Sequence, residues 1–128
     1  MNTRTLLIVT AAIEIGAGLA LAILPSAAVS VLLGSPLDSP VGLAVARIAG
    51  VALMSLAIAC WLVRDDADSR AGKGLVAAML VYNGGAVAVL AYAGVGLDRP
   101  AVLLWLAVVV HVIMAAWCGA SLKRMRED

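Results

Sequence analysis

The chain has 128 residues, of which 64% are hydrophobic and 13% charged, and its mean hydropathy is +1.08. Soluble domains are about half apolar and about a quarter charged, so water is not the solvent for most of this sequence. The length fits one domain and excludes a multidomain enzyme, and a net charge of +1 excludes the basic surface that nucleic-acid binding needs.

Four long apolar runs divide the chain, and they cover residues 6–24, 41–63, 74–95 and 101–122. Each has about the 20 residues with which an α-helix crosses a hydrocarbon core of about 30 Å. The connecting segments are short and rich in turn-forming residues, so consecutive helices are expected to be antiparallel neighbours. The sequence therefore predicts an all-α fold, an integral membrane antiparallel four-helix bundle in which residues 1–128 form a single transmembrane domain.

Residues 25–33 follow the first apolar run without a polar break. Pro25 suits the first turn of a helix and Gly34 suits a helix end, which predicts a short helix lying in the membrane interface. The alternative is a tilted first helix that continues past a bend at Pro25. Arg4 before the first run and Ser26 after it also resemble a cleaved signal peptide, but Glu14 interrupts that pattern, so we expect a retained first span.

The basic residues near the span ends are distributed unequally between the two sides of the membrane. Arg99 alone lies on one side, and the other side carries Arg4, Arg64, Arg70, Lys73, Lys123, Arg124 and Arg126. Because basic residues favour the cytoplasmic side, both termini and the middle loop are predicted to be cytoplasmic, in a bacterial inner membrane. Cys60 and Cys118 lie at the same ends and are expected to be free thiols in a reducing compartment.

Four polar side chains interrupt the apolar spans: Glu14, Arg47, Asn83 and His111. At 1.5 Å of rise per residue they lie about 15, 9, 18 and 15 Å below the outer helix ends. Arginine is long enough to reach inward by a helical turn, so all four are expected to meet in one layer near the midplane. Ionisable residues inside a membrane normally face the bundle interior and have partners there.

Glu14 and Arg47 are predicted to contact each other directly or through one polar group. Small residues at a spacing of four let helices approach closely, and the first two spans carry the ladders Ala12-Gly16-Ala20 and Gly42-Ala46-Gly50. Two interpretations stay open for such a pair. It is either part of a functional site or a buried ion pair that fixes the register of the helices and does nothing else.

In the functional interpretation, Glu14 and His111 are candidates for proton transfer and Arg47 stabilises negative charge. The other candidate ligand-binding residues are Asn83, Met54, Met79 and Met114, with Tyr82 and Ser55 as secondary candidates. A plain structural role is the alternative for the methionines, as core filler, and for Asn83, as a link between helices. The two cysteines give no zinc pattern, so no metal site is predicted, and the cofactor stays unassigned.

Glu14 in the first span, the segment from Pro25 to Gly34, and Ala46-Arg47-Ile48-Ala49-Gly50 in the second span resemble the small four-helix membrane proteins of the DoxX-like group. The resemblance extends over most of the chain. It implies a four-helix membrane bundle and a connection with quinone-associated redox chemistry, and it carries over no site residue.

Three functions fit these features. The first is binding of an apolar or amphipathic small molecule, such as a quinone, an isoprenoid or a sterol-like molecule, with or without proton transfer. The second is a small transporter or proton carrier, which would need a homodimer to enclose enough volume. The third is an accessory subunit of a larger membrane complex. The expected partners are membrane lipids, a hydrophobic ligand, and either further copies of the chain or other membrane subunits.

Overall fold

The computed structural model describes residues 2–97 and 101–127, which form five α-helices. They are α1 (Thr3–Ile23), α2 (Pro25–Leu33), α3 (Pro40–Val63), α4 (Arg70–Gly96) and α5 (Val102–Glu127). The four helices other than α2 are long and apolar enough to cross a membrane. The predicted all-α class and its four long apolar helices are thus confirmed. Arg99, the only basic residue expected at the outer side, lies outside the described residues.

Side chains set the starts of the long helices. The hydroxyl of Ser39 accepts a hydrogen bond from the backbone N–H of Gly42 at 2.9 Å, and that of Ser69 accepts one from Gly72 at 3.0 Å. Such N-caps satisfy backbone donors that have no partner within the helix. Because Ser69 caps α4, this helix begins several residues before the apolar run and includes the basic residues Arg70 and Lys73.

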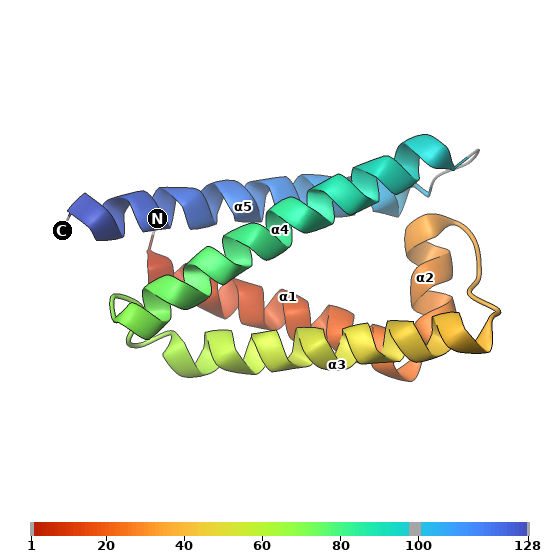
Figure 1. Cartoon of the computed structure of the whole chain (residues 1–128), viewed down its shortest axis with the longest axis horizontal. Helices are drawn as coiled ribbons and strands as arrows, with labels where there is room; N and C mark the ends of the chain where they lie inside the picture. The colour runs from red at the N-terminus through yellow and green to blue at the C-terminus, as the bar shows by residue number, and fades with distance from the viewer. Residues whose placement is uncertain (1, 98–100, 128) are drawn as a thin grey trace.

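The segment after α1 is a separate helix. Leu24 leaves the helical conformation with φ −125° and ψ 55°, and Pro25 occupies the first turn of α2. Gly34, at φ 81°, then ends α2 in a left-handed conformation that glycine adopts without steric cost. In Figure 1, α2 stands across the direction of the long helices. The bent continuation of the first helix is therefore wrong.

The long helices associate as two pairs. α1 packs along α3 and α4 packs along α5, whereas the contacts between these two pairs are much sparser. In Figure 1 the α3–α4 connection lies at the same end of the molecule as both labelled termini, and this end is called the terminal end below. We call the boundary between the α1/α3 pair and the α4/α5 pair the seam.

The close approach predicted for the first two spans is present, but one of the two expected ladders is not responsible for it. Ala46 and Gly50 of α3 are buried against α1, as predicted. On α1 the ladder Ala12-Gly16-Ala20 is exposed, and Gly18 meets Gly50 instead. The inward face of α1 carries Thr10 and Glu14, and since Gly18 continues that face at a spacing of four, burying the polar residues turns the other ladder outward.

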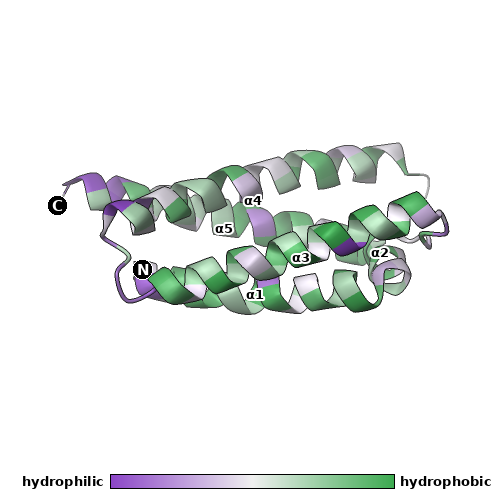
Figure 2. Ribbon diagram, turned by 60° about the horizontal axis from the view of Figure 1, so that its bottom comes forward, coloured by the Kyte–Doolittle hydropathy of each residue, from purple (hydrophilic) through white to green (hydrophobic). Residues whose placement is uncertain are grey.

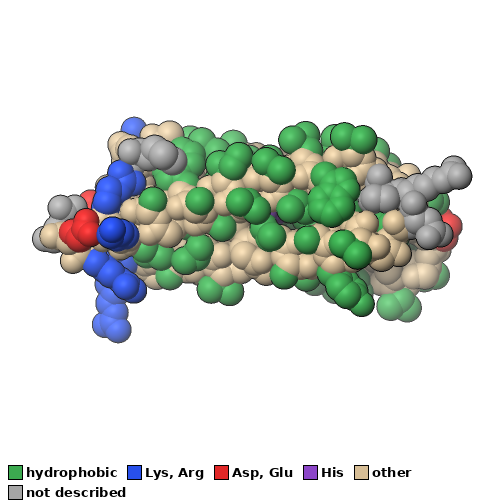
Figure 3. Space-filling view, turned by 90° about the horizontal axis from the view of Figure 1, so that it is seen from above, with side chains coloured by type: hydrophobic (Ala, Val, Ile, Leu, Met, Phe, Trp, Pro, Cys, Tyr) green, Lys and Arg blue, Asp and Glu red, His purple; other side chains and the backbone are tan. Residues whose placement is uncertain are grey.

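Apolar side chains cover most of the length of the molecule, while charge gathers at the terminal end. Figure 2 shows green along the long helices and purple mostly at their terminal end, and Figure 3 shows lysine and arginine side chains grouped there. Cys60 and Cys118 are buried free thiols within one apolar cluster to which four helices contribute. The cluster contains Leu6, Leu7, Ala11, Cys60, Val76, Met79, Met114, Cys118 and Met125.

Candidate polar site at the seam between the helix pairs

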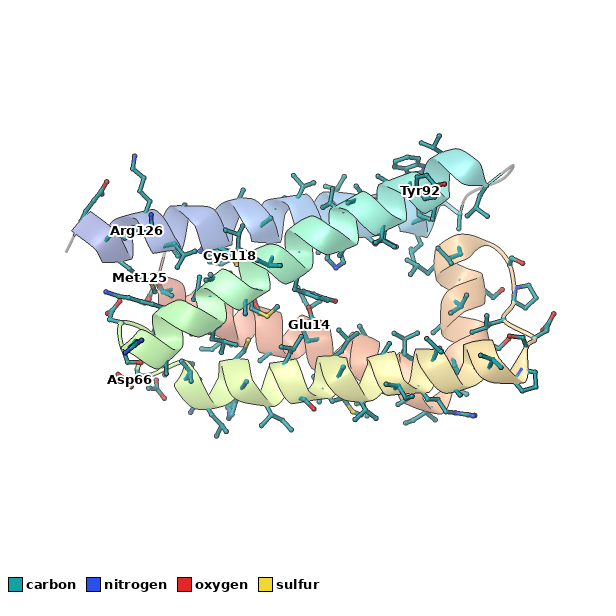
Figure 4. The ribbon with its side chains drawn as sticks, viewed as in Figure 1. Glu14, Asp66, Tyr92, Cys118, Met125 and Arg126 are labelled. Carbon is teal, nitrogen blue, oxygen red and sulfur yellow. The ribbon has the colours of Figure 1, made fainter. Side chains whose placement is uncertain are left out.

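Glu14 is the polar residue around which the candidate site is built. Its side chain lies near the middle of α1, between the two helix pairs (Figure 4), and the residue is only 4% exposed. The Tyr82 hydroxyl of α4 donates a hydrogen bond to Glu14 Oε2 at 3.3 Å. This distance is long for a bond between two oxygen atoms. The bond therefore links the two helix pairs while leaving the carboxyl group incompletely satisfied.

Thr10 lies one helical turn from Glu14 on the same face of α1. It is 2% exposed, and its hydroxyl has no hydrogen-bond partner among the described residues. Buried hydroxyl groups are usually paired, so an unpartnered one beside a buried carboxyl group is unusual. The inward face of α1 thus presents hydrogen-bonding capacity that the protein itself does not use.

His111 of α5 places an imidazole beside the ring of Tyr82. The two ring centroids are 5.9 Å apart and the rings are inclined by 58°. His111 Nδ1 lies 2.7 Å from the carbonyl oxygen of Ala107. Because a carbonyl oxygen only accepts, Nδ1 must carry the hydrogen, and in the neutral ring Nε2 is then an acceptor. Half-buried His111 therefore offers an acceptor nitrogen close to the Tyr82 ring.

Asn83 is buried but directed into its own helix. Its Nδ2 donates to the carbonyl oxygen of Met79 at 2.7 Å, one turn back along α4. The neighbouring Tyr82 is half-buried, so both residues turn away from the surface although they follow each other in the chain. Asn83 belongs to the same region of α4 as Tyr82, but no bond joins it to Glu14 or His111 in the described part of the chain.

Arg47 does not take part in this cluster, and the predicted Glu14–Arg47 pair is wrong. Arg47 is exposed on α3, and neither residue belongs to an ion pair among residues 2–97 and 101–127. Burial of Ala46 and Gly50 against α1 fixes the rotation of α3, and Arg47 then points outward. An arginine can lay its aliphatic stem along an apolar surface and keep its charged end clear of that surface, so Arg47 does not need an internal acid.

The predicted methionines are divided between two environments. Met79 and Met114 belong to the apolar cluster that contains both cysteines, and half-buried Met54 lies beside Gly18 at the contact between α1 and α3. Ser55 is exposed, and its hydroxyl donates to the carbonyl oxygen of Val51 within α3. The structure therefore brings Met79 and Met114 near Tyr82 as core residues and leaves Ser55 outside the cluster.

Two grooves in the described structure lie away from the polar cluster. One, of about 320 Å³, lies between α1 and α3 and has almost wholly apolar walls. The other, of about 380 Å³, lies between α4 and α5 at the terminal end. Glu14, Tyr82 and His111 line neither of them.

The polar cluster consists of a carboxyl group, a phenol and an imidazole that come from three helices. Sequence reasoning named Glu14 and His111 first and placed Tyr82 second, although Tyr82 is the residue that touches both. It did not name Thr10 as a site residue, although Thr10 precedes Glu14 by four residues and therefore lies on the same face of the helix. Chemically, the cluster can donate and accept hydrogen bonds: one such bond joins Tyr82 to Glu14, and His111 bonds to its own helix.

No family model matches the chain, and the comparisons with curated proteins and with solved structures found no match.

Proposed function

We propose that the chain is an integral membrane protein whose four long helices cross the bilayer as an antiparallel bundle. The support for this is their length and apolar surface, and the gathering of basic side chains at one end. In this proposal the terminal end is cytoplasmic, the membrane is a bacterial inner membrane, and α2 lies in the opposite interface. The DoxX-like resemblance is part of the same proposal and rests on the residues alone.

We further propose that the protein binds an amphipathic small molecule, a quinone or an isoprenoid or sterol-like compound, with its polar head at the Glu14 cluster. The observation that carries this function is a carboxyl group only 4% exposed, bonded across the seam by Tyr82, with His111 against the same phenol. Ionisable residues at such positions in membrane helices usually mark functional sites. The unused Thr10 hydroxyl supplies a further donor for a polar head.

The seam gives such a molecule a route of entry. The main chains approach each other less closely between the helix pairs than within them, so the seam is the boundary through which such a molecule would enter. A carbonyl or hydroxyl head could then bond to Thr10, to Glu14 or to His111 Nε2, while its apolar tail stays in lipid. A head that contacts both Glu14 and His111 could exchange a proton with either side chain.

A titration with a short-tailed benzoquinone tests this function, with quenching of tryptophan fluorescence as the signal. Tyr82→Phe removes only the hydroxyl and should weaken binding roughly 2- to 10-fold, the equivalent of one net hydrogen bond. Tyr92→Phe is the matched control, because Tyr92 lies on the same helix but is 85% exposed. Equal affinities for the wild type, Tyr82→Phe and His111→Ala would refute a quinone site at the cluster.

Arg47 favours a second candidate, an accessory subunit of a larger membrane complex. It is a cation on an otherwise apolar, exposed face of α3, with Val45, Ile48 and Val51 exposed around it. An acidic residue on a partner helix would complement it. In that case Arg47→Leu should release the partner on gentle extraction while Tyr82→Phe does not, which is the reverse of the pattern for a ligand site. If the partner is a second copy of the chain, the same exposed face would form the dimer interface of the homodimeric transporter.

A further inference from the structure

The groove between α1 and α3 is apolar along its length. Its walls are aliphatic from α1 and aliphatic and aromatic from α3, with almost no polar surface. The lining residues are Ile8, Ala11, Ala12, Ile15, Ala57, Ile58 and Trp61. Its volume of about 320 Å³ is at the lower end of the range for small-molecule pockets. Such a groove fits one flexible hydrocarbon chain.

An arginine lies just beyond the groove on each of its two helices. Arg4 precedes Ile8 by one helical turn on α1, so the two residues share a face. On α3, Arg64 follows Trp61 by three residues, and its guanidinium carbon lies 4.0 Å from the centroid of the Trp61 ring. Arg64 also donates to the carbonyl oxygen of Trp61. One ring thus forms both the end of the apolar groove and the platform for a cation.

Asp65 holds the two arginines together without neutralising them. Arg4 Nε lies 2.6 Å from Asp65 Oδ1, and Arg64 Nη2 lies 3.3 Å from Asp65 Oδ2. Two guanidinium groups share one carboxylate, so the group has a net charge of +1. Guanidinium groups have five N–H donors each, so both retain donors for a second anion. The paired N–H donors of a guanidinium group match the geometry of phosphate as well as that of carboxylate.

We propose that this groove and its two arginines form a binding site for an anionic phospholipid of the leaflet at the terminal end. One acyl chain lies in the groove, and the phosphate group contacts Arg4 and Arg64. Basic pockets between membrane helices on the cytoplasmic side are known to bind anionic headgroups. The site rests on the proposed membrane insertion, and it is independent of the Glu14 cluster, whose residues do not line the groove.

Native mass spectrometry of the purified chain in detergent tests the site, with phosphatidylglycerol and phosphatidylcholine of identical acyl chains as probes. We expect phosphatidylglycerol to bind roughly 25-fold more tightly, because each of the two arginines should contribute about 1 kcal/mol. Arg64→Gln should weaken it roughly fivefold, as expected for one arginine at an anionic surface, and adding Arg4→Gln should bring it to the level of phosphatidylcholine. The control is Arg70→Gln with Arg126→Gln, which removes the same charge from exposed positions at the same end.

The groove is tested separately with Ala12→Leu, which fills it, and with Ala78→Leu on an exposed face of α4 as the control. Ala12→Leu should weaken both lipids and leave their ratio unchanged. Circular dichroism and gel filtration establish that each variant is folded, and Arg64→Gln keeps the Arg4–Asp65 pair if the double variant is unstable. Equal losses in the Arg4/Arg64 and Arg70/Arg126 variants would mean a general basic surface and overturn the proposal, as would unchanged binding in Ala12→Leu.

Discussion

Gly18 and Gly50 each lie against the other's backbone. A Cβ atom at Gly50 would be 2.6 Å from the carbonyl oxygen of Gly18, and one at Gly18 would be 2.7 Å from the carbonyl oxygen of Gly50. At this point α1 and α3 meet through their main chains, with no space for a side chain. Small residues allow helices to approach this closely, so the pairing of α1 with α3 depends on having glycine, which has no side-chain carbon, at both positions.

Gly50→Ala should therefore destabilise the protein by about 1–3 kcal/mol, the usual cost of forcing extra atoms into a packed interior. The loss is measured as a shift of the unfolding midpoint when a denaturing detergent is added to protein in mild micelles. Gly16→Ala is the control, because a Cβ there meets nothing within 4 Å. The close approach would be unimportant if both substitutions gave the same midpoint.

Glu14 and Arg47 should contribute to stability independently of each other. One is buried at the seam and the other is exposed on α3. In a double-mutant cycle with Glu14→Gln and Arg47→Leu, the free energies of unfolding should add to within about 0.5 kcal/mol. An interaction energy well above this value would mean that Glu14 and Arg47 are paired, in contradiction to the structure.

The Arg4–Asp65 bridge should make a small pH-dependent contribution to stability. The hydrogen bond from Arg4, together with the charges of Arg64 and Arg4, holds the pKa of Asp65 below its ordinary value of 3.8. A carboxyl group whose pKa is lower in the folded state stabilises the protein above its unfolded pKa and loses this effect as the pH falls through the folded value. The difference in melting temperature between wild type and Asp65→Asn should therefore be largest above about pH 4 and vanish in stronger acid. A difference that is constant with pH would contradict this account.

Labelling of single introduced cysteines tests the orientation. Asp38 and Asp68 are suitable positions, since both are exposed and neither caps a helix, unlike the adjacent Ser39 and Ser69. A membrane-impermeant maleimide added to intact cells should label Asp38→Cys and spare Asp68→Cys until the membrane is opened. The native cysteines are buried and give a low background. The opposite pattern would invert the proposed topology.

The sequence predicted what depends on composition, and it also predicted that Glu14 and Asn83 face the interior, but it missed the rotation of α3. Apolar length identified the four long helices, and Pro25 with Gly34 bounded α2. The rotation of α3 was not predictable, because either Arg47 or the small residues Ala46 and Gly50 could have faced the interior. In the structure the small residues are buried, and Arg47 is exposed. The rotation of α4 had the same uncertainty, so Tyr82 was ranked below Asn83 although Tyr82 makes the bond to Glu14.

The order of the two helix pairs along the chain bears on how the protein is made. α1 and α3 are both complete before α4 begins, so the Gly18–Gly50 contact can form while the later helices are still being synthesised. In the proposed membrane location, Glu14 would at that stage face lipid on the open side of the first pair, with no Tyr82 hydroxyl to bond to. When α4 packs against the first pair, Tyr82 donates a hydrogen bond to Glu14 and the carboxyl group becomes buried. The need to cover Glu14 would thus favour docking of the second helix pair on the first.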